Sequence, residues 1–322
     1  MSECRQTAEP GSKPSAGRIL RPLPLLEGPL KGRFGWMRPI YGSNCNLLYK
    51  ARDGVTGADV VIKIPKYNED KDTWRSLKMR KVVEAEALSR LNHPCVIPLV
   101  GAYEASDRVY VKDGTMFPFV VLPYVEGTDL GEAICRLPPD MCEETKRGLA
   151  RLLYNAAGAM AHTHGAGVVH GDMKPGNIMW TGTGLPMVFD FELALLAGVT
   201  REESDGNIAG TPGFMPPEQV LAVDGAVDAR SDIWAFGAVV YCAYERTLPI
   251  GLEEADIERG NIYGLMRKYR RLRPMPMRDE RLGWVVGKAM QWNPDERFQS
   301  MGEMVCALRE CWKDELGTDV VE

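Results

Sequence analysis

The spacing of apolar and polar residues divides the chain into a strand-rich first part and a helix-rich second part. In the first part, short runs of β-branched and aromatic residues alternate with polar turns, which predicts an antiparallel meander. Apolar residues at helical spacing predict one helix over roughly 71–91 and a long helix over 140–164. We therefore expect an α+β protein whose first lobe has a small sheet of about five strands and one helix, with strands near 34–40, 46–51, 60–64, 96–103 and 117–121.

The rest of the chain is predicted to be mainly helical, with an apolar, buried helix over 231–244. Residues 1–32 show no regular spacing and are rich in proline, glycine and serine, so we expect a flexible tail there. Its segment 23–26, Leu-Pro-Leu-Leu, has a second interpretation, in which it packs on the folded body or binds a partner. A short tail is also expected at 317–322.

Composition and charge restrict the class of protein. The 322 residues are 45% hydrophobic and 26% charged, which is typical of a globular chain. The net charge of −5 argues against a nucleic-acid or membrane-surface binder, since both are usually basic. We find no apolar run long enough for a spanning helix and no secretory signal. Eight scattered cysteines without a C-x-x-C pair favour reduced thiols in a cytoplasmic protein over disulfides or structural zinc.

One polar stretch, 170–177, lies between short apolar segments. It contains an acid, Asp172, a cation, Lys174, and an amide, Asn177. A solvated turn can contain the same residue types, so the stretch alone leaves both interpretations open. Lys63 raises a second question, because an unpaired ammonium group in an apolar strand is costly.

A series of short motifs gives these residues a context. In order they are Val60-Val61-Ile62-Lys63; Glu84 followed by Leu91-Asn92-His93-Pro94; the 170–177 stretch; Asp190-Phe191; Gly210-Thr211-Pro212 with Pro216-Pro217-Glu218; Ser231-Asp232-Ile233-Trp234; and Asn293-Pro294 with Arg297. This order resembles the eukaryotic-type (Hanks-type) protein kinase superfamily over residues 34–316, and it is most similar to the bacterial Ser/Thr kinases. The resemblance implies a two-lobed fold with an N-lobe at 33–122, a hinge at 123–126 and a C-lobe at 127–316.

The resemblance implies a catalytic role for each polar residue of the 170–177 stretch. Asp172 matches the catalytic base, which accepts the proton of the substrate hydroxyl. Lys174 would neutralise charge on the transferred phosphoryl group. Asn177 and Asp190 would supply oxygen ligands to Mg²⁺, for which Mn²⁺ can substitute.

The resemblance also implies an ATP site between the lobes. Lys63 would contact the α and β phosphates, and Glu84 would orient it as an ion pair; on its own, Glu84 could equally be a surface residue. The remaining positions are Leu48 and Val61 in the roof of the adenine pocket, Met179 in its floor, Leu122 as gatekeeper, Pro123 and Val125 at the adenine edge, Asp129 near the ribose and Gly42 in the loop above the phosphates.

Further positions are implied to have structural roles. Glu218 and Arg297 should form a buried ion pair, and Asp232 should brace the backbone of the catalytic loop. Leu88, Leu99, His170 and Phe191 should stack into a spine that links the lobes.

The chain departs from the family pattern in three places. Tyr41, Ser43 and Asn46 stand where the phosphate-covering loop usually has glycines, which puts the geometry of that loop in question. Gly171 replaces the arginine that commonly receives an activation-loop phosphate. Glu192 replaces the glycine after Asp190-Phe191, which predicts a segment biased toward one conformation.

The resemblance implies MgATP-dependent phosphoryl transfer to serine or threonine hydroxyls of a protein substrate. Because Gly171 lacks the phosphate-receiving side chain, we expect little dependence on phosphorylation at Thr200 or Ser204; Thr211 is expected in the active site itself. Two alternatives stay open: a pseudokinase or ATP-binding scaffold, and a kinase-fold phosphotransferase that acts on a small molecule. A partner could dock on the N-terminal tail or on the basic cluster 267–273, which can also be a solvated helix face.

Overall fold

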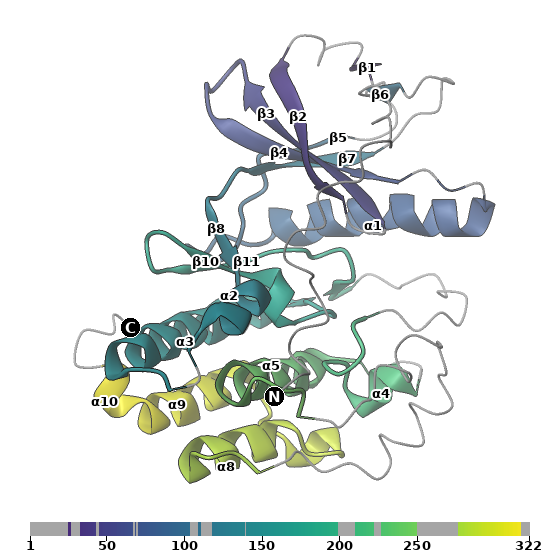
Figure 1. Ribbon diagram of the computed structural model, residues 1–322. Helices are drawn as coiled ribbons and strands as arrows, with labels where there is room; N and C mark the ends of the chain where they lie inside the picture. Colours follow the sequence, from purple (N-terminus) through teal and green to yellow (C-terminus); the bar gives the residue numbers. More distant parts are fainter. Residues whose placement is uncertain are drawn as a thin grey trace.

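The computed structural model describes residues 25–26, 33–42, 45–66, 68, 70–103, 109–110, 118–138, 140–198, 210–221, 227–249 and 276–316. Within these ranges, a small sheet with one long helix lies on one side and a layer of helices on the other (Figure 1). The predicted α+β, two-lobed fold is therefore confirmed.

Five antiparallel strands form the sheet of the first lobe, in the order β2-β3-β4-β7-β5. Residues of β4 alternate between the two faces, and most of them are buried because β4 is the central strand. This position places Lys63 in the interior. The strands are β2 (Phe34–Gly42), β3 (Asn46–Asp53), β4 (Asp59–Pro65), β5 (Gly101–Tyr103) and β7 (Phe119–Pro123).

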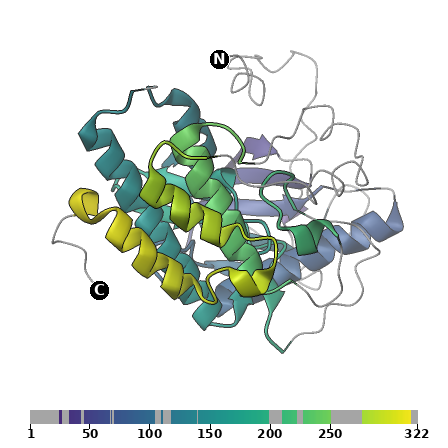
Figure 2. The same cartoon turned by 90° about the horizontal axis from the view of Figure 1, so that it is seen from below.

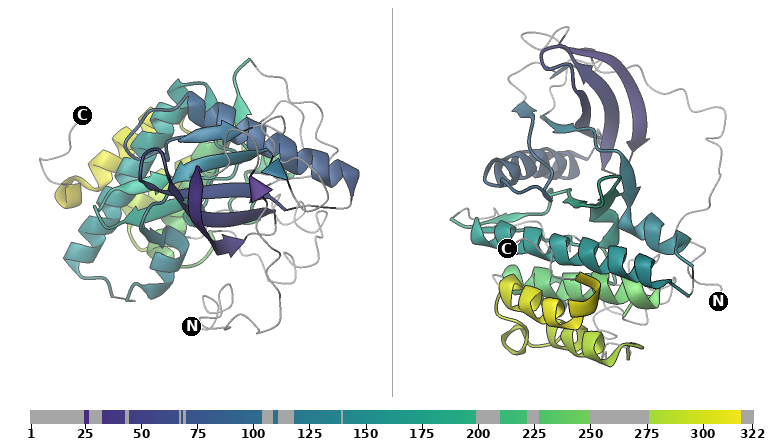
Figure 3. Two further views of the ribbon diagram at one scale, coloured as in Figure 1. Left: turned by 90° about the horizontal axis from the view of Figure 1, so that it is seen from above. Right: turned by 90° about the vertical axis from the view of Figure 1, so that its left-hand side faces the viewer.

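Helix α1 (Lys71–Ser89) lies against this sheet (Figure 3). Its residues belong to two apolar cores. Its start is capped by Asp70, whose carboxylate accepts a hydrogen bond of 2.8 Å from the backbone N–H of Thr73. Trp74 packs in the core of the sheet, whereas Leu88 packs in the core of the second lobe. The helix therefore connects the two lobes as well as covering the sheet.

The second lobe is built on helices α3 and α5, which are packed together at its centre (Figure 2). Apolar residues at helical spacing give α3 one buried face, and α5 is buried over most of its length. Helices α8 and α9 cover this pair. The helices are α2 (Leu130–Arg136), α3 (Glu143–Gly165), α4 (Pro217–Val220), α5 (Ala229–Glu245), α8 (Glu280–Ala289), α9 (Met301–Cys311) and α10 (Lys313–Leu316).

Five short strands between the lobes hold the polar stretches in place. Strand β10 pairs with both β8 and β11, and β9 pairs with β12. The 170–177 stretch connects β9 to β10 and ends in a 3₁₀ turn at Pro175–Asn177, while Asp190 follows β11. The 170–177 stretch and the stretch that contains Asp190 therefore both lie at the ends of these paired strands. The strands are β8 (Gly127–Asp129), β9 (Val168–Val169), β10 (Ile178–Thr181), β11 (Pro186–Val188) and β12 (Leu195–Leu196).

The strand predicted at 96–103 is wrong for most of its length, since only Gly101–Tyr103 joins the sheet as β5. Val96 instead forms an isolated parallel bridge with Val188, and the N–H of Ile97 donates to the carbonyl of Val188 over 2.9 Å. Pro98 has no N–H to give to a sheet ladder. The apolar run thus connects the lobes before it enters the sheet.

Within the predicted tail, Leu25–Leu26 form strand β1, which pairs with β6 (Val109–Tyr110). The other residues of the tail up to 32, and the basic cluster 267–273, lie outside the described residues. None of the helices in the described part of the chain combines the length and the apolar character that a membrane crossing requires.

Candidate active site

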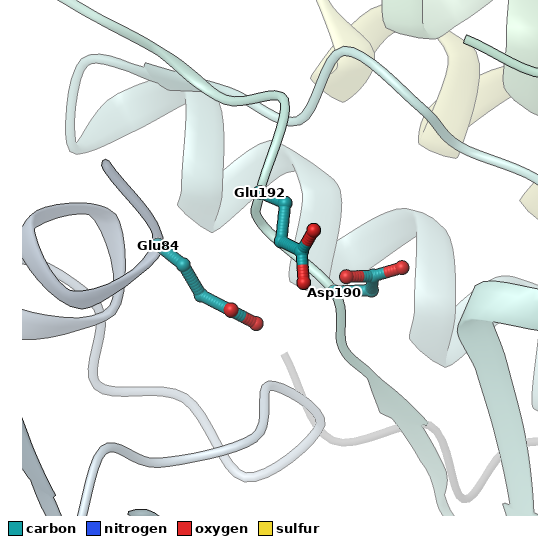
Figure 4. A group of neighbouring side chains, drawn as sticks. All are labelled: Glu84, Asp190 and Glu192. Atoms are coloured by element: carbon teal, nitrogen blue, oxygen red, sulfur yellow. The ribbon is translucent and has the colours of Figure 1, made fainter. Parts of the chain in front are cut away.

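Lys63 extends from the centre of β4 toward three carboxylates. Its Nζ lies 2.8 Å from Glu84 Oε1, 2.6 Å from Asp190 Oδ1 and 2.6 Å from Glu192 Oε1. Glu84 comes from α1, and the other two follow β11; the three carboxylates face a common centre (Figure 4). The expected Lys63–Glu84 ion pair is present, so the buried ammonium group has its partner.

A second lysine, Lys81, is almost fully buried at 1% exposure one turn before Glu84. Its Nζ lies 3.4 Å from Glu84 Oε2 and bonds directly to Glu192 Oε1. Lys63, Glu84, Lys81 and Glu192 therefore alternate in sign around a closed circuit, which we call the charge ring. Asn46 of β3 donates from Nδ2 to Glu192 Oε1 over 2.6 Å, which connects β3 to this ring.

Burial and charge act in opposite directions on the groups of this site. Burial alone would lower the pKa of Lys63, but the charges of Asp190, Glu84 and Glu192 hold it well above its ordinary value. Burial raises the pKa of Glu84, and the two lysines offset this only in part. For Glu192 and Asp190 burial is outweighed by the lysine charges, so the pKa of Glu192 is lowered and that of Asp190 falls to about 2.

The carboxylate of Asp172 is held by two groups on the opposite side of the site. Its Oδ1 accepts a hydrogen bond of 2.8 Å from Thr211 Oγ1, and its Oδ2 lies 2.9 Å from Lys174 Nζ. Lys174 also donates to Thr211 Oγ1 over 2.8 Å, which closes a triangle that we call the loop triangle. A carboxylate that accepts from a hydroxyl beside an ammonium group can act as a base toward a hydroxyl.

Asp232 holds the backbone that carries Asp172. Its carboxylate accepts from the N–H of His170 over 2.7 Å and of Gly171 over 3.0 Å, and it also contacts His164 Nε2 over 2.8 Å. Burial opposes ionisation of Asp232, but the hydrogen bond and charge of His164 lower its pKa. The expected brace is therefore present.

Gly171 occupies a position that only glycine fits. Its φ is +78°, and a Cβ built there would lie 2.4 Å from the carbonyl oxygen of Leu193. The carbonyl of Gly171 in turn accepts a hydrogen bond of 2.8 Å from Gln219 Nε2. The place of the usual arginine is thus closed by neighbouring backbone.

Asn177 and Asp190 are brought next to one another by the pairing of β10 with β11. The carbonyl of Asn177 accepts from the N–H of Phe189 over 3.1 Å, directly before Asp190. Asn177 Nδ2 donates to the carbonyl of Asp172 over 2.7 Å, which leaves its amide oxygen as the atom suited to a metal. Asp190 has φ +71°, an uncommon backbone conformation for a residue with a side chain. An amide oxygen and a carboxylate are donors that fit a hard cation such as Mg²⁺.

The expected adenine-pocket residues lie on the strands that border the hinge. Leu48 pairs in register with Lys63, Val61 with Leu122, and Met179 with Asp129. Leu122 is buried, whereas Leu48, Val61, Pro123, Val125 and Met179 are half-buried. Asp129 Oδ1 caps α2 by accepting from the N–H of Glu132 over 2.9 Å, and Gly42 pairs with Leu47 at the end of β2.

Two expected structural contacts complete the site. Arg297, whose side chain is fully buried, donates to both oxygens of Glu218 over 2.7 and 2.8 Å, and Ser231 donates to the same carboxylate. His170 and Phe191 lie with ring centroids 4.6 Å apart. Leu88 and Leu99 belong to the apolar core around Phe191.

Comparison with known proteins agrees with this geometry. The family described as "Protein kinase domain" matches residues 42–307, which include both sides of the site. The chain belongs to the protein kinase domain family. Among similar proteins, the DNA damage-responsive serine/threonine-protein kinase RqkA of Deinococcus radiodurans is 32% identical over 90% of this chain and 42% of its own length. The serine/threonine-protein kinase PknB of Mycobacterium leprae is 28% identical, over 80% of this chain and 39% of its own. This kinase chain thus spans less than half the length of these relatives.

Sequence reasoning did not predict the roles of three residues of this kinase site, namely Lys81, Asn46 and Gln219. Lys81 and Glu84 are three positions apart on α1, so a lysine on the same face as a buried glutamate was a usable signal. Asn46 was noted only as a missing glycine, and Gln219 was not noted. The contacts of Asn46 with Glu192 and of Gln219 with Gly171 join segments that are far apart in the chain, so no local sequence pattern predicts them.

Proposed function

We propose that the chain catalyses MgATP-dependent transfer of a phosphoryl group to serine or threonine hydroxyls of a protein. The observation that carries the proposal is the loop triangle, in which Asp172 already accepts a hydrogen bond from the hydroxyl of Thr211. The names of the similar proteins support the same substrate class.

In the proposed reaction the residues of this chain bind and orient the reactants. Asp172 accepts the proton of the substrate hydroxyl at its carboxylate and aims the oxygen at phosphorus, which is worth about 10²–10⁴ in rate. Lys174 offsets negative charge on the transferred group, and Lys63, fixed by Glu84, holds the α and β phosphates. Mg²⁺ held by Asn177 and Asp190 would neutralise the phosphate oxygens.

The adenine base is proposed to bind between the half-buried residues Leu48, Val61, Met179, Pro123 and Val125 and the buried Leu122, with Asp129 at the ribose. Residues 33–122, 123–126 and 127–316 are the proposed N-lobe, hinge and C-lobe. A cytoplasmic location is part of the proposal and rests on composition.

We further propose that transfer does not depend on phosphorylation of the activation segment. The support is Gly171, whose place leaves no room for an arginine without movement of Leu193. Thr200 and Ser204, the candidate phosphorylation sites, lie outside the described residues.

A pseudokinase is the second candidate, and the glycine-poor loop favours it, because Asn46 of that loop is tied down to Glu192 rather than left open for phosphate. Against it stand the assembled Lys63–Glu84 pair and the loop triangle. An ATP-binding scaffold needs the Lys63–Glu84 pair but not the loop triangle.

The proposal is tested by transfer of radiolabelled γ-phosphate from ATP to a generic serine- and threonine-containing protein, with Mg²⁺ or Mn²⁺. We expect label on serine and threonine with the wild type and loss of it in Asp172→Ala. Wild-type protein that binds ATP without labelling any substrate would support the pseudokinase. Label that persists in Asp172→Ala would rule out the assigned base.

A further inference from the structure

The charge ring contains one acid and one base beyond the expected Lys63–Glu84 pair. Glu192 stands where the family usually has glycine, and Lys81 is the cation that contacts it. Glu192 Oε1 accepts from Lys63, Lys81 and Asn46 at once. The two additional charges therefore occur together and neutralise each other inside the protein.

Without Lys81 the carboxylates would compete for Lys63. Lys63 already contacts Glu84, Asp190 and Glu192, and in the proposed reaction it must also hold phosphate. A buried carboxylate with no counter-ion is strongly unfavourable, so Glu192 would retain Lys63, the other cation that contacts it among the described residues. With Lys81 present, the ring is balanced within itself, and Asp190 is the one carboxylate of the cluster left over for a metal.

We propose that Lys81 is a positioning residue: by neutralising Glu192 it leaves Lys63 to Glu84 and to the phosphates of ATP. The proposal rests on the proposed kinase function for the role of Lys63. The same pair fixes the segment after β11 to α1, and Asn46 extends the link to β3. The acid at 192 is thus tolerated because a base at 81 accompanies it.

The two single charge removals are expected to damage the site in different ways. In Lys81→Met, Glu192 draws Lys63 away from Glu84 and from phosphate. In Glu192→Gln, Lys81 keeps its contact with Glu84, 3.4 Å away, and competes with Lys63 for it. The double variant Lys81→Met/Glu192→Gln keeps the Lys63–Glu84 pair and removes the competition from Lys81 and from the charge of Glu192, and the amide oxygen that the second substitution introduces can still accept the hydrogen bond from Asn46.

The experiment is a double-mutant cycle on nucleotide affinity, kcat and KM. Binding of a fluorescent ATP analogue with Mg²⁺ is titrated, and KM and kcat for ATP are measured in parallel. Each single variant is expected to weaken binding and raise KM by roughly ten-fold, and the double variant to recover most of that loss. Lys78→Met, the same change three positions earlier on α1, is the matched control and should leave binding unchanged, because Lys78 is half-buried with its Nζ 5.3 Å from the ring centroid of Trp74 rather than in the charge ring.

Effects of the two single variants that add in the double variant would overturn the proposal, as would an unchanged affinity in Lys81→Met. A fall in thermal stability without a change in affinity or KM would show a purely structural role and would also overturn it. Absence of transfer by the wild type would count against the proposed function alone, because the binding cycle still decides the role of Lys81.

Discussion

The two sides of the site are held together by different physical means. The charge ring is buried, and its four groups are held by ion pairs with one another. The loop triangle is more open, with the side chain of Lys174 28% exposed, and its position is fixed by backbone contacts to Asp232. The ring contains Glu192 where the family usually has glycine, whereas the triangle keeps the residue types of the family. A site held by backbone contacts can keep its chemistry while its neighbour is rebuilt, so the two sides should be separable by mutation.

The largest expected effect comes from substituting one aspartate on each side of the site, Asp172 of the loop triangle and Asp190 beside the charge ring. Asp172→Asn and Asp190→Asn should each lower the rate of phosphoryl transfer by about 10²–10⁴-fold. Nucleotide affinity should be unchanged in Asp172→Asn, whereas Asp190→Asn should lose the part of the affinity that depends on Mg²⁺. Titration of a fluorescent ATP analogue with and without Mg²⁺ measures this difference. Equal losses of affinity in both variants would show that the two sides are not independent.

The second prediction concerns the anchor beneath the loop triangle. Arg297→Met leaves Glu218 buried without its cation and should lower the free energy of unfolding by about 3–5 kcal/mol. Arg230→Met, which removes a more exposed pair with Asp228 and Asp295, should cost about 1 kcal/mol or less. Denaturant unfolding checks both. Nucleotide affinity of the folded Arg297→Met protein should be retained, and its loss would link the anchor to the ring.

The third prediction is that, on acidification, the Lys63–Glu84 pair of the charge ring is lost before Asp232, which braces the loop triangle, is protonated. The pKa of Glu84 is raised above 4.5, so its proton binds, and the Lys63–Glu84 pair weakens, at a pH above 4.5. This costs affinity for MgATP but not folding stability, because the folded form binds that proton more tightly than the unfolded chain. The pKa of Asp232 is lowered below 3.8, so its contribution to stability is complete above pH 3.8 and is lost as the pH falls through the lower folded value.

Parallel titrations of affinity and thermal unfolding test this order. Glu84→Gln is the control, since its affinity is already low and should lack the additional fall that Glu84 protonation causes. A wild-type affinity that stays constant until unfolding begins would contradict the prediction.

The last prediction is that removing the two candidate phosphorylation sites leaves the rate of transfer unchanged. The double variant Thr200→Ala/Ser204→Ala should transfer phosphate at the wild-type rate, because Gly171 provides no cation to receive a phosphate at either position. Thr211→Ala should be slower, since it removes a donor to Asp172, and Thr211→Ser should restore the rate. A steady-state transfer assay compares the three, and inactivity of the double variant would refute phosphorylation-independent activity.

The order of motifs was enough to predict the fold, the Lys63–Glu84 pair and the Glu218–Arg297 anchor, because each of these follows from a residue type at a fixed place in a known framework. The strand at 96–103 was misjudged because an apolar run does not say which partner its backbone will bond, and part of it bonds across the lobes to Val188. The role of Lys81 was missed because burial of a lysine depends on acids brought to it by folding.

The departures were recognised singly from the sequence, but their relationship was not. Asn46 and Glu192 are 146 positions apart, and only the packed structure shows that one donates to the other. A residue that breaks a family pattern is better understood with the residue that compensates for it than as a defect.

The closed space at Gly171 has a consequence for how control of this protein could evolve. Introducing an arginine there would be the simplest way to make activity answer to a phosphate, yet its Cβ would meet the carbonyl of Leu193 in a backbone conformation that disfavours side chains. The change would require the segment after β11 to shift, and that segment is held by Glu192. Control of activity by an activation-segment phosphate would therefore require several coordinated substitutions. New regulation would more readily come from a partner or an attached domain.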